Sequence, residues 1–200
     1  MTPTVFVVDD DAALREALVQ LLEAAGLSVE SYPDGRAFLR AFGEGRPGCL
    51  LLDVAMPGMT GLEVQTELRT RGIPIPIVFL TGHGDIPMAV RAVQAGALDF
   101  LEKPMTGTAL LERVRRALAL DHEDRHAKAL VRDIGERASR LSPREREVMR
   151  LVVGGSSSKE VARLLGISVR TVEAHRTHVM HKMGAANLAE LVGMAAYVEA

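Results

Sequence analysis

Residues 49–58 read CLLLDVAMPG, an apolar run that ends on an aspartate and passes directly into a loop with proline and glycine. Such a run, bounded by turn residues, predicts a strand buried on both faces. An aspartate after a strand can simply cap the next helix. That interpretation fails for Asp53, because no helical pattern begins before about residue 61. Asp53 is therefore a candidate functional carboxylate.

Similar short apolar runs alternate with amphipathic ones on both sides of this strand. Strands buried on both faces are predicted at 5–8, 49–53, 77–80 and 97–101, with a weaker one at 27–32, and helices near 12–25, 34–42, 61–70, 86–95 and 106–119. Five strand–helix pairs predict an α/β fold, a doubly wound five-stranded parallel sheet with right-handed crossovers. A functional site is expected at the carboxyl ends of its strands.

Three carboxylates stand at predicted strand ends: Asp9 and Asp10 after the first strand, and Asp53 after the third. If these strands are neighbours, the carboxylates converge and repel one another unless a cation lies among them. An all-oxygen set of this kind suits magnesium. Asp11, just before a helical pattern, is predicted to be a helix cap instead.

Two further strand ends carry groups that a phosphoryl acceptor would need. Thr81 offers a hydroxyl and Lys103 a positive charge for phosphoryl oxygens. Because no structural partner of the Lys103 ammonium is evident from the sequence, we expect this charge to matter more to the phosphorylated state than to folding.

In these features residues 1–120 resemble a two-component receiver domain of flavodoxin-like topology. The matching elements are Asp9-Asp10, the run from Asp53 to Gly61, Thr81-Gly82 and Lys103-Pro104. The resemblance implies that a sensor histidine kinase phosphorylates Asp53. It also implies a cis peptide before Pro104, and Thr81 and Lys103 against the phosphoryl group.

The same resemblance implies a metal site and a switch. Mg²⁺ (or Mn²⁺) would be held by Asp10, Asp53 and the carbonyl of Ala55, with Asp9 reaching it through water. Thr81 and Phe100 would be the switch residues. Ala55 is smaller than the side chains common at its position, which leaves the carbonyl ligand intact and changes access to the phosphoryl group.

Residues 121–140 are predicted to be a helical linker, and residues 141–200 a second domain. The linker carries an apolar stripe at helical spacing, formed by Ala127, Leu130, Val131, Ile134, Ala138 and Leu141. This stripe could pack on the chain's own domains or pair with a second copy. Ser142-Pro143 with Glu145 predicts a capping box at the start of the second domain.

Two short helices joined by a glycine-containing turn give residues 158–183 the outline of a helix-turn-helix. A helix at 143–153 comes first; Ser158 is predicted to cap the next, to about residue 165, and a helix at 169–183 follows the turn at 166–168. The predicted interior is Val161, Leu164, Leu165, Ile167, Val172, Val179 and Met183. An ordinary helical hairpin with a charged, solvated face is the alternative.

The run from Leu141 to Gly184 resembles the LuxR-type DNA-binding domain, and the whole chain resembles the FixJ-like response regulators. The resemblance implies base contacts by Glu173, Ala174 and Thr177, and phosphate contacts by Lys159, Arg170, Thr171, Arg176 and Lys182. It further implies promoter DNA and RNA polymerase as partners, transcription activation, and a homodimer when phosphorylated.

Charge and composition agree with such a regulator. The formal net charge is -2, with an acidic first part and a mildly basic residue balance after residue 120. Cys49, the single cysteine, is expected to be a packing residue. No apolar stretch reaches the ~20 residues of a membrane span, so we expect a cytoplasmic protein that contacts no membrane.

Several other features of the sequence bear on alternative sites and functions. The GEGRPG run at 43–48 precedes a strand rather than a helix and is not a dinucleotide site. Two histidine sets, His122/His126 and His175/His178/His181, are predicted to be solvated or phosphate-facing, since no cysteine or carboxylate in the sequence completes either set of metal ligands.

Ala55 stands where an aspartate-nucleophile phosphatase carries a second aspartate, which argues against an enzyme. A protein-interaction module that has lost DNA binding remains the third alternative.

Overall fold

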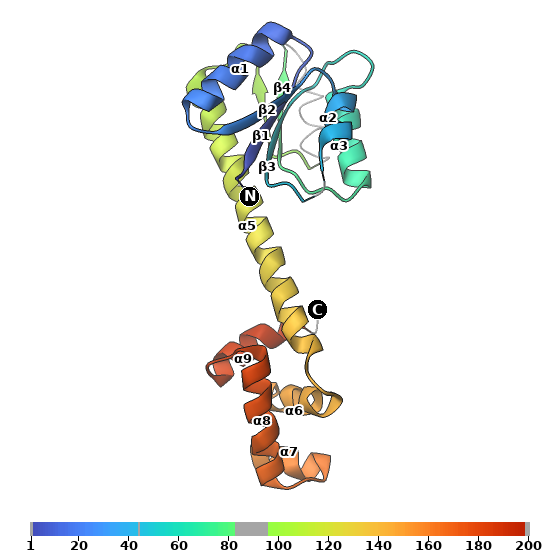
Figure 1. Cartoon of the computed structure of the whole chain (residues 1–200), viewed down its shortest axis with the longest axis vertical. Coiled ribbons are helices and arrows are strands. Elements are labelled where there is room, and N and C mark those ends of the chain that lie inside the picture. Colours follow the sequence, from blue (N-terminus) through green and yellow to red (C-terminus); the bar gives the residue numbers. More distant parts are fainter. Residues whose placement is uncertain (1, 44, 83–95, 199–200) are drawn as a thin grey trace. The chain divides into compact units, whose positions relative to one another are not determined.

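The computed structural model describes residues 2–43, 45–82 and 96–198 (Figure 1). Its contacts divide the chain into two compact units, 1–125 and 126–200. The sequence-based division at 120 and 140 stays a prediction. The first unit extends past 120 because Asp121, on a helix, accepts a 2.8 Å hydrogen bond from the Gly48 backbone at the start of a strand.

The first unit contains a five-stranded parallel sheet in the order β2-β1-β3-β4-β5. The strands are β1 Thr4–Val8, β2 Ser28–Tyr32, β3 Gly48–Asp53, β4 Ile77–Thr81 and β5 Asp99–Glu102. The described helices are α1 Ala12–Ala24, α2 Gly35–Ala41, α3 Gly61–Thr70 and α5 Gly107–Ser139. The helix predicted at 86–95 lies outside the described residues.

Both faces of this sheet are covered, as the continuous apolar runs predicted. Phe6 of β1 points to a core with Phe38 of α2 and Val64 of α3. Its neighbours Val5 and Val7 point to the opposite core, with helices α1 and α5. In Figure 1 α2 and α3 lie on one side of the strands and α1 on the other. The prediction of a doubly wound α/β sheet is confirmed.

The two edge strands depart from full burial. β2 is only partly covered, which explains its weak apolar pattern. The prediction that residues 97–101 form a strand buried on both faces was wrong, because β5 is also an edge strand and exposes Phe100 and Glu102. An edge strand has a neighbour on one side only, so alternate side chains can remain in water.

The second unit is helical. After α5 come α6 Pro143–Val153, α7 Ser158–Leu165, α8 Val169–Met183 and α9 Leu188–Ala195. The end of the predicted linker stripe packs here: Ile134, Ala138 and Leu141 are buried with Val179 and Met183 of α8. Leu130 and Val131 stay exposed at 44% and 43%, so the stripe packs within the unit only at its C-terminal end.

Local signals at the helix ends are mostly confirmed. Asp11 caps α1 and Ser142 forms a capping box with Glu145. The predicted cap at Ser158 was wrong: Ser157 is the N-cap of α7 and pairs with Glu160 three residues on. Ser156, Ser157 and Ser158 are adjacent, and only Ser157 has the glutamate at the spacing that a capping box needs.

The turn between α7 and α8 is built on glycine. Gly166 ends α7 with φ of 65°, in the left-handed region where a side chain is strained. Leu164, predicted to be interior, is 61% exposed, because this short helix turns Val161 and Ala162 to the core instead.

Among the helices that the structure describes, none combines the length and the apolar composition of a membrane span.

Candidate functional site

The order of the strands brings the candidate carboxylates together. β1 and β3 are neighbours and pair Val8 with Leu52, so Asp9 and Asp53 follow at the same level of the sheet. Lys103 comes directly after β5, and its backbone N–H donates to the Thr81 carbonyl at 2.7 Å. The carboxyl ends of four strands thus meet around one point, as expected for a parallel sheet.

Lys103 bridges the two buried carboxylates. Its Nζ lies 2.6 Å from Asp9 Oδ2 and 2.6 Å from Asp53 Oδ1. Asp9 is fully buried, and Asp53 is 5% exposed. Two carboxylates at this depth repel each other, and the ammonium between them offsets that repulsion. Lys103 therefore has structural partners that the sequence did not reveal.

The remaining oxygens of these carboxylates are held by backbone groups. The Ala55 N–H donates to Asp53 Oδ2 at 3.1 Å, and the Asp11 N–H donates to Asp9 Oδ1 at 2.9 Å. Asp10, which lies between Asp9 and Asp11 in the chain, is exposed. The structure thus fixes the orientation of two carboxylates, and the third is exposed to solvent.

Burial and charge oppose each other in this pocket. Burial raises the pKa of Asp53, and the Lys103 hydrogen bond offsets only part of that effect. Burial acts to lower the pKa of Lys103, but the hydrogen bonds to Asp53 and Asp9 outweigh it, so this pKa is raised. Lys103 is accordingly charged, and the pocket still favours additional positive charge near Asp53.

The donor set fits a hard divalent cation. Asp9 and Asp53 bring two carboxylates against the single ammonium of Lys103, Asp10 adjoins Asp9 in the chain, and the Ala55 carbonyl belongs to the loop whose N–H already contacts Asp53. Oxygen ligands with excess negative charge are what Mg²⁺ prefers. Burial, with a smaller contribution from the charge of Asp9, raises the pKa of Asp53, so a further positive charge at this carboxylate would be favourable.

Gly61 allows the loop after Asp53 to close tightly. Its N–H donates to the Val54 carbonyl at 3.0 Å, and a Cβ at this position would lie 2.3 Å from the Asp53 carbonyl oxygen. Any larger residue would push α3 away from the strand end. This close approach, rather than a positive φ, is why glycine stands here.

Two predicted switch residues occupy different environments. Thr81, the last residue of β4, is 8% exposed, and its hydroxyl donates to the Gly82 carbonyl at 3.1 Å. Phe100 is 43% exposed on β5.

The Lys103–Pro104 peptide, directly after the lysine that contacts both carboxylates, is cis, as predicted.

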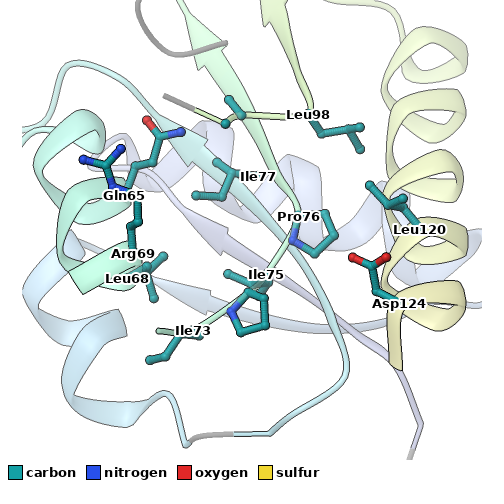
Figure 2. A pocket seen from close by; sticks show the side chains of 13 residues that line it. Gln65, Leu68, Arg69, Ile73, Ile75, Pro76, Ile77, Leu98, Leu120 and Asp124 are labelled. Carbon is teal, nitrogen blue, oxygen red and sulfur yellow. The ribbon is translucent and has the colours of Figure 1, made fainter. Parts of the chain in front are cut away.

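A separate apolar hollow lies at the opposite end of the same sheet (Figure 2). It has a volume of about 480 Å³ and is lined by residues before and at the starts of β4 and β5, with Leu68 of α3 and Leu120 of α5. β4 and β5 begin at this hollow and end, at Thr81 and before Lys103, at the opposite edge of the sheet where the carboxylates lie. It therefore takes no part in the carboxylate chemistry.

In the second unit, most of the predicted nucleic-acid contacts are exposed on α7 and α8. These exposed residues are Lys159, Arg170, Thr171, Glu173, Ala174 and Thr177. Arg176 is partly buried and donates to Ser158 Oγ at 3.2 Å. An exposed set with polar and cationic side chains near the starts of two helices is suited to binding phosphates and base edges.

Lys182 has an intramolecular partner that the sequence did not predict. Its Nζ lies 2.6 Å from Glu145 Oε2 on α6, so its charge is shared with a buried carboxylate. The capping-box pattern identified Glu145 only as a local cap. No sequence signal joins two residues that are 37 positions apart.

Comparison with known proteins identifies both units. The family described as response regulator receiver domain matches residues 5–115, and the family of bacterial regulatory proteins of the LuxR type matches residues 139–195. The chain belongs to the two-component response regulators that join a receiver to a LuxR-type DNA-binding domain, the FixJ-like group. It is a DNA-binding transcription regulator, of a family that consists of transcription factors rather than catalysts.

Individual relatives cover nearly the whole chain. The transcriptional regulatory protein FixJ of Azorhizobium caulinodans is 46% identical over 96% of this chain and 90% of its own length. Nodulation protein W of Bradyrhizobium diazoefficiens is 45% identical over 95% of this chain and 84% of its own. The solved structure of the response regulator StyR has a TM-score of 0.91 at 43% identity, covering 98% of this chain and 99% of that one.

Proposed function

We propose that Asp53 is the phosphoacceptor of this regulator and that its phosphorylation by a sensor histidine kinase controls promoter binding. The observation that carries the proposal is the Asp53 carboxylate at the end of β3, oriented by the Ala55 N–H and bound to Lys103 at 2.6 Å. An oriented, partly compensated carboxylate is prepared to attack a phosphoryl group in line.

In this proposal each pocket residue has a role of its own. Asp53 supplies the attacking oxygen, and Lys103, released from that oxygen, offsets charge on the transferred group. Thr81 supplies a hydroxyl for a phosphoryl oxygen. Asp9, Asp10, Asp53 and the Ala55 carbonyl would hold Mg²⁺ (or Mn²⁺), which supplies positive charge to the phosphoryl transfer when bound.

The signal would leave the pocket through β4 and β5. The acyl phosphate carries about -1.5 to -2 charges in place of the single negative charge of the Asp53 carboxylate, and it draws Thr81 and Lys103 toward itself. Phe100, exposed at 43% and three residues before Lys103, would change its rotamer in response. The surface that changes would then include β5 and the first turns of α5.

At promoter DNA, we propose that α8 enters the major groove with Glu173, Ala174 and Thr177 toward base edges. Lys159, Arg170, Thr171, Arg176 and Lys182 would contact phosphates. RNA polymerase is the further partner, and activation the expected effect on transcription. Such a regulator would act in the cytoplasm, where the promoters are.

The test combines acyl phosphorylation with promoter binding. Incubation with acetyl phosphate and Mg²⁺ should add one phosphoryl mass per chain, in a hydroxylamine-labile form, and should raise affinity for promoter DNA. Asp53→Asn should gain no label. A label that persists in Asp53→Asn would refute the assignment.

The same titration tests the DNA surface with a matched pair of charge deletions. Arg170→Ala on α8 should weaken promoter binding and reduce the salt dependence by about one phosphate contact. Lys128→Ala removes an exposed charge from α5 instead and should bind as the parent does. Equal binding by both variants would contradict the proposed face.

A further inference from the structure

We propose that Glu145, His175 and His178 form a binding site for a divalent transition-metal ion of the zinc class. Glu145 lies on α6, and the two histidines lie on α8. One carboxylate oxygen and one ring nitrogen from each histidine all lie within 4.8 Å of one another. Among the described residues, this is the set of three histidine, cysteine or acidic side chains whose ligand atoms come this close together.

The sequence pointed away from this site. His175 and His178 follow the i, i+3 spacing that places two side chains on one helix face, but no carboxylate near them in the sequence completes a ligand set. The fold supplies that carboxylate from another helix. The prediction that these histidines are merely solvated or phosphate-facing therefore omitted a ligand 30 residues upstream of His175.

The Glu145 carboxylate divides its two oxygens between different tasks. Oε2 accepts hydrogen bonds from the Ser142 N–H at 2.7 Å and from Lys182 Nζ at 2.6 Å. Oε1 instead faces His178 Nδ1 at 3.7 Å, which is too long for a hydrogen bond. One oxygen is thus committed to the helix cap, and the other is directed at the histidines.

A buried nitrogen of His175 supports the assignment independently. Its Nδ1 is buried and has no hydrogen-bond partner in the described structure. A buried polar atom without a partner is uncommon in folded proteins, and a bound water or ion is among the groups that can satisfy it. A metal ion that accepts a nitrogen lone pair would satisfy an imidazole in this cluster.

Two imidazoles and one carboxylate match the ligands of tetrahedral zinc. Bonds of about 2.0–2.1 Å require ligand atoms roughly 3.3 Å apart, so side-chain rotations must draw the present cluster inward. The His178 side chain is 64% exposed and can make this movement, and water can take the fourth position. Lys182 binds the other oxygen of Glu145 and, at 36% exposed, can turn toward solvent as the ion enters.

A bound ion would join α6 to α8, the helix that carries the proposed base contacts. It would fix α8 against α6, which supports it. Metal binding would thus stabilise the second unit by an amount that grows with the logarithm of the free ion concentration once that concentration exceeds the Kd. This inference stands apart from the phosphorylation of Asp53.

The test is titration of the full chain with Zn²⁺ by calorimetry, with Co²⁺ absorption as a report of ligand geometry. Excess Mg²⁺ keeps the acidic pocket of the first unit from contributing. We expect one Zn²⁺ per chain, a tetrahedral Co²⁺ spectrum and a rise in the unfolding temperature. His175→Asn and His178→Asn should each weaken Zn²⁺ binding by about tenfold or more.

His181→Asn is the matched control, because His181 is an exposed histidine of the same helix outside the cluster. It should bind Zn²⁺ as the parent does. Glu145→Gln should also lose Zn²⁺ binding. Because Glu145 is buried, this substitution can unfold the second unit; in that case the His178→Asn variant, which changes an exposed side chain, tests the site instead. Absence of Zn²⁺ binding by the parent, or binding that survives in both His175→Asn and His178→Asn, would overturn the proposal.

Discussion

Lys103 is placed so that its removal affects folding as well as signalling. The sequence showed no partner for its ammonium, whereas the structure gives it two carboxylates at 2.6 Å each. The expectation that its charge matters more to the phosphorylated state than to folding rested on that missing partner. Without Lys103, the buried Asp9 and Asp53 carboxyl groups would have no cation between them.

We therefore predict that Lys103→Ala loses about 1–3 kcal/mol of folding free energy in the absence of metal, the cost of leaving a buried charged group unpaired. Mg²⁺ should restore part of the loss, since it replaces the missing positive charge. Thermal unfolding with EDTA and with Mg²⁺ measures both effects. Lys159→Ala, an exposed lysine, is the control, and a Lys103→Ala as stable as the parent in EDTA would contradict the prediction.

At the scale of elements, the start of α3 depends on one close backbone contact. A Cβ on Gly61 would meet the Asp53 carbonyl oxygen at 2.3 Å and the Phe79 ring at 2.9 Å. We predict that Gly61→Ala destabilises the chain by about 1–3 kcal/mol, the usual cost of overpacking. Because the displaced helix start adjoins Asp53, acyl phosphorylation by acetyl phosphate should slow as well.

Gly135→Ala provides a control of opposite sign. Gly135 lies within α5, and a Cβ there would meet nothing within 4 Å. Alanine should then stabilise the helix by roughly 0.5–1 kcal/mol through its higher helix propensity. Denaturant unfolding of both variants separates a steric effect from a general effect of removing glycine; equal shifts in the two would refute the steric argument.

The capping box of α6 predicts a pH dependence of stability. The Lys182 hydrogen bond, together with the Ser142 backbone N–H, lowers the pKa of Glu145 from 4.5 to about 2. The folded chain thus binds this proton less tightly than the unfolded chain. The stabilisation is complete above pH 4.5 and is lost as the pH falls toward 2.

Glu145→Gln should accordingly cost about 1.5–3 kcal/mol at pH 7, as for a hydrogen bond to a charged group. The difference from the parent should shrink as the pH approaches the lowered pKa. Thermal unfolding across this range in EDTA, which keeps metal out, is the measurement. Glu136→Gln, with an exposed side chain, should change stability little at any pH, and a pH-independent deficit in Glu145→Gln would show that charge is not the cause.

At the scale of the whole molecule, we predict a monomer that dimerises when phosphorylated and then binds two half-sites of an approximate inverted repeat. The phosphoryl group would alter the surface around Phe100 and α5, on which two copies could pair. Joining two DNA-binding units raises affinity through effective concentration. Each unit alone would make only a few phosphate contacts and bind weakly.

Light scattering before and after acyl phosphorylation, paired with promoter titration, is the corresponding measurement. The mass should double only with the phosphoryl group present, and Asp53→Asn should remain a monomer throughout. A phosphorylated chain that stays monomeric both free and on its promoter would contradict the dimer mechanism. The identification of the chain as a response regulator would be unaffected.

Features that depend on neighbours in the chain were determined by the sequence alone. The apolar run before Asp53, the alternation of strands and helices, the Ser142 capping box and the glycine turn at Gly166 all follow from residues within a few positions of one another. Periodicity, caps and turns are local properties of the sequence, so they can be predicted without knowing which elements pack together. The family resemblance added the cis peptide before Pro104.

Features that join distant residues were decided only by the tertiary structure. The bond from Lys103 to Asp9, the shared carboxylate of Glu145 and the exposed side of β5 each depend on which elements become neighbours. The same holds for Glu145 with His175 and His178, since a ligand set spread over two helices has no spacing in the sequence. Packing, not local propensity, brings such groups within bonding distance, because charge and ligand interactions act through space rather than along the chain.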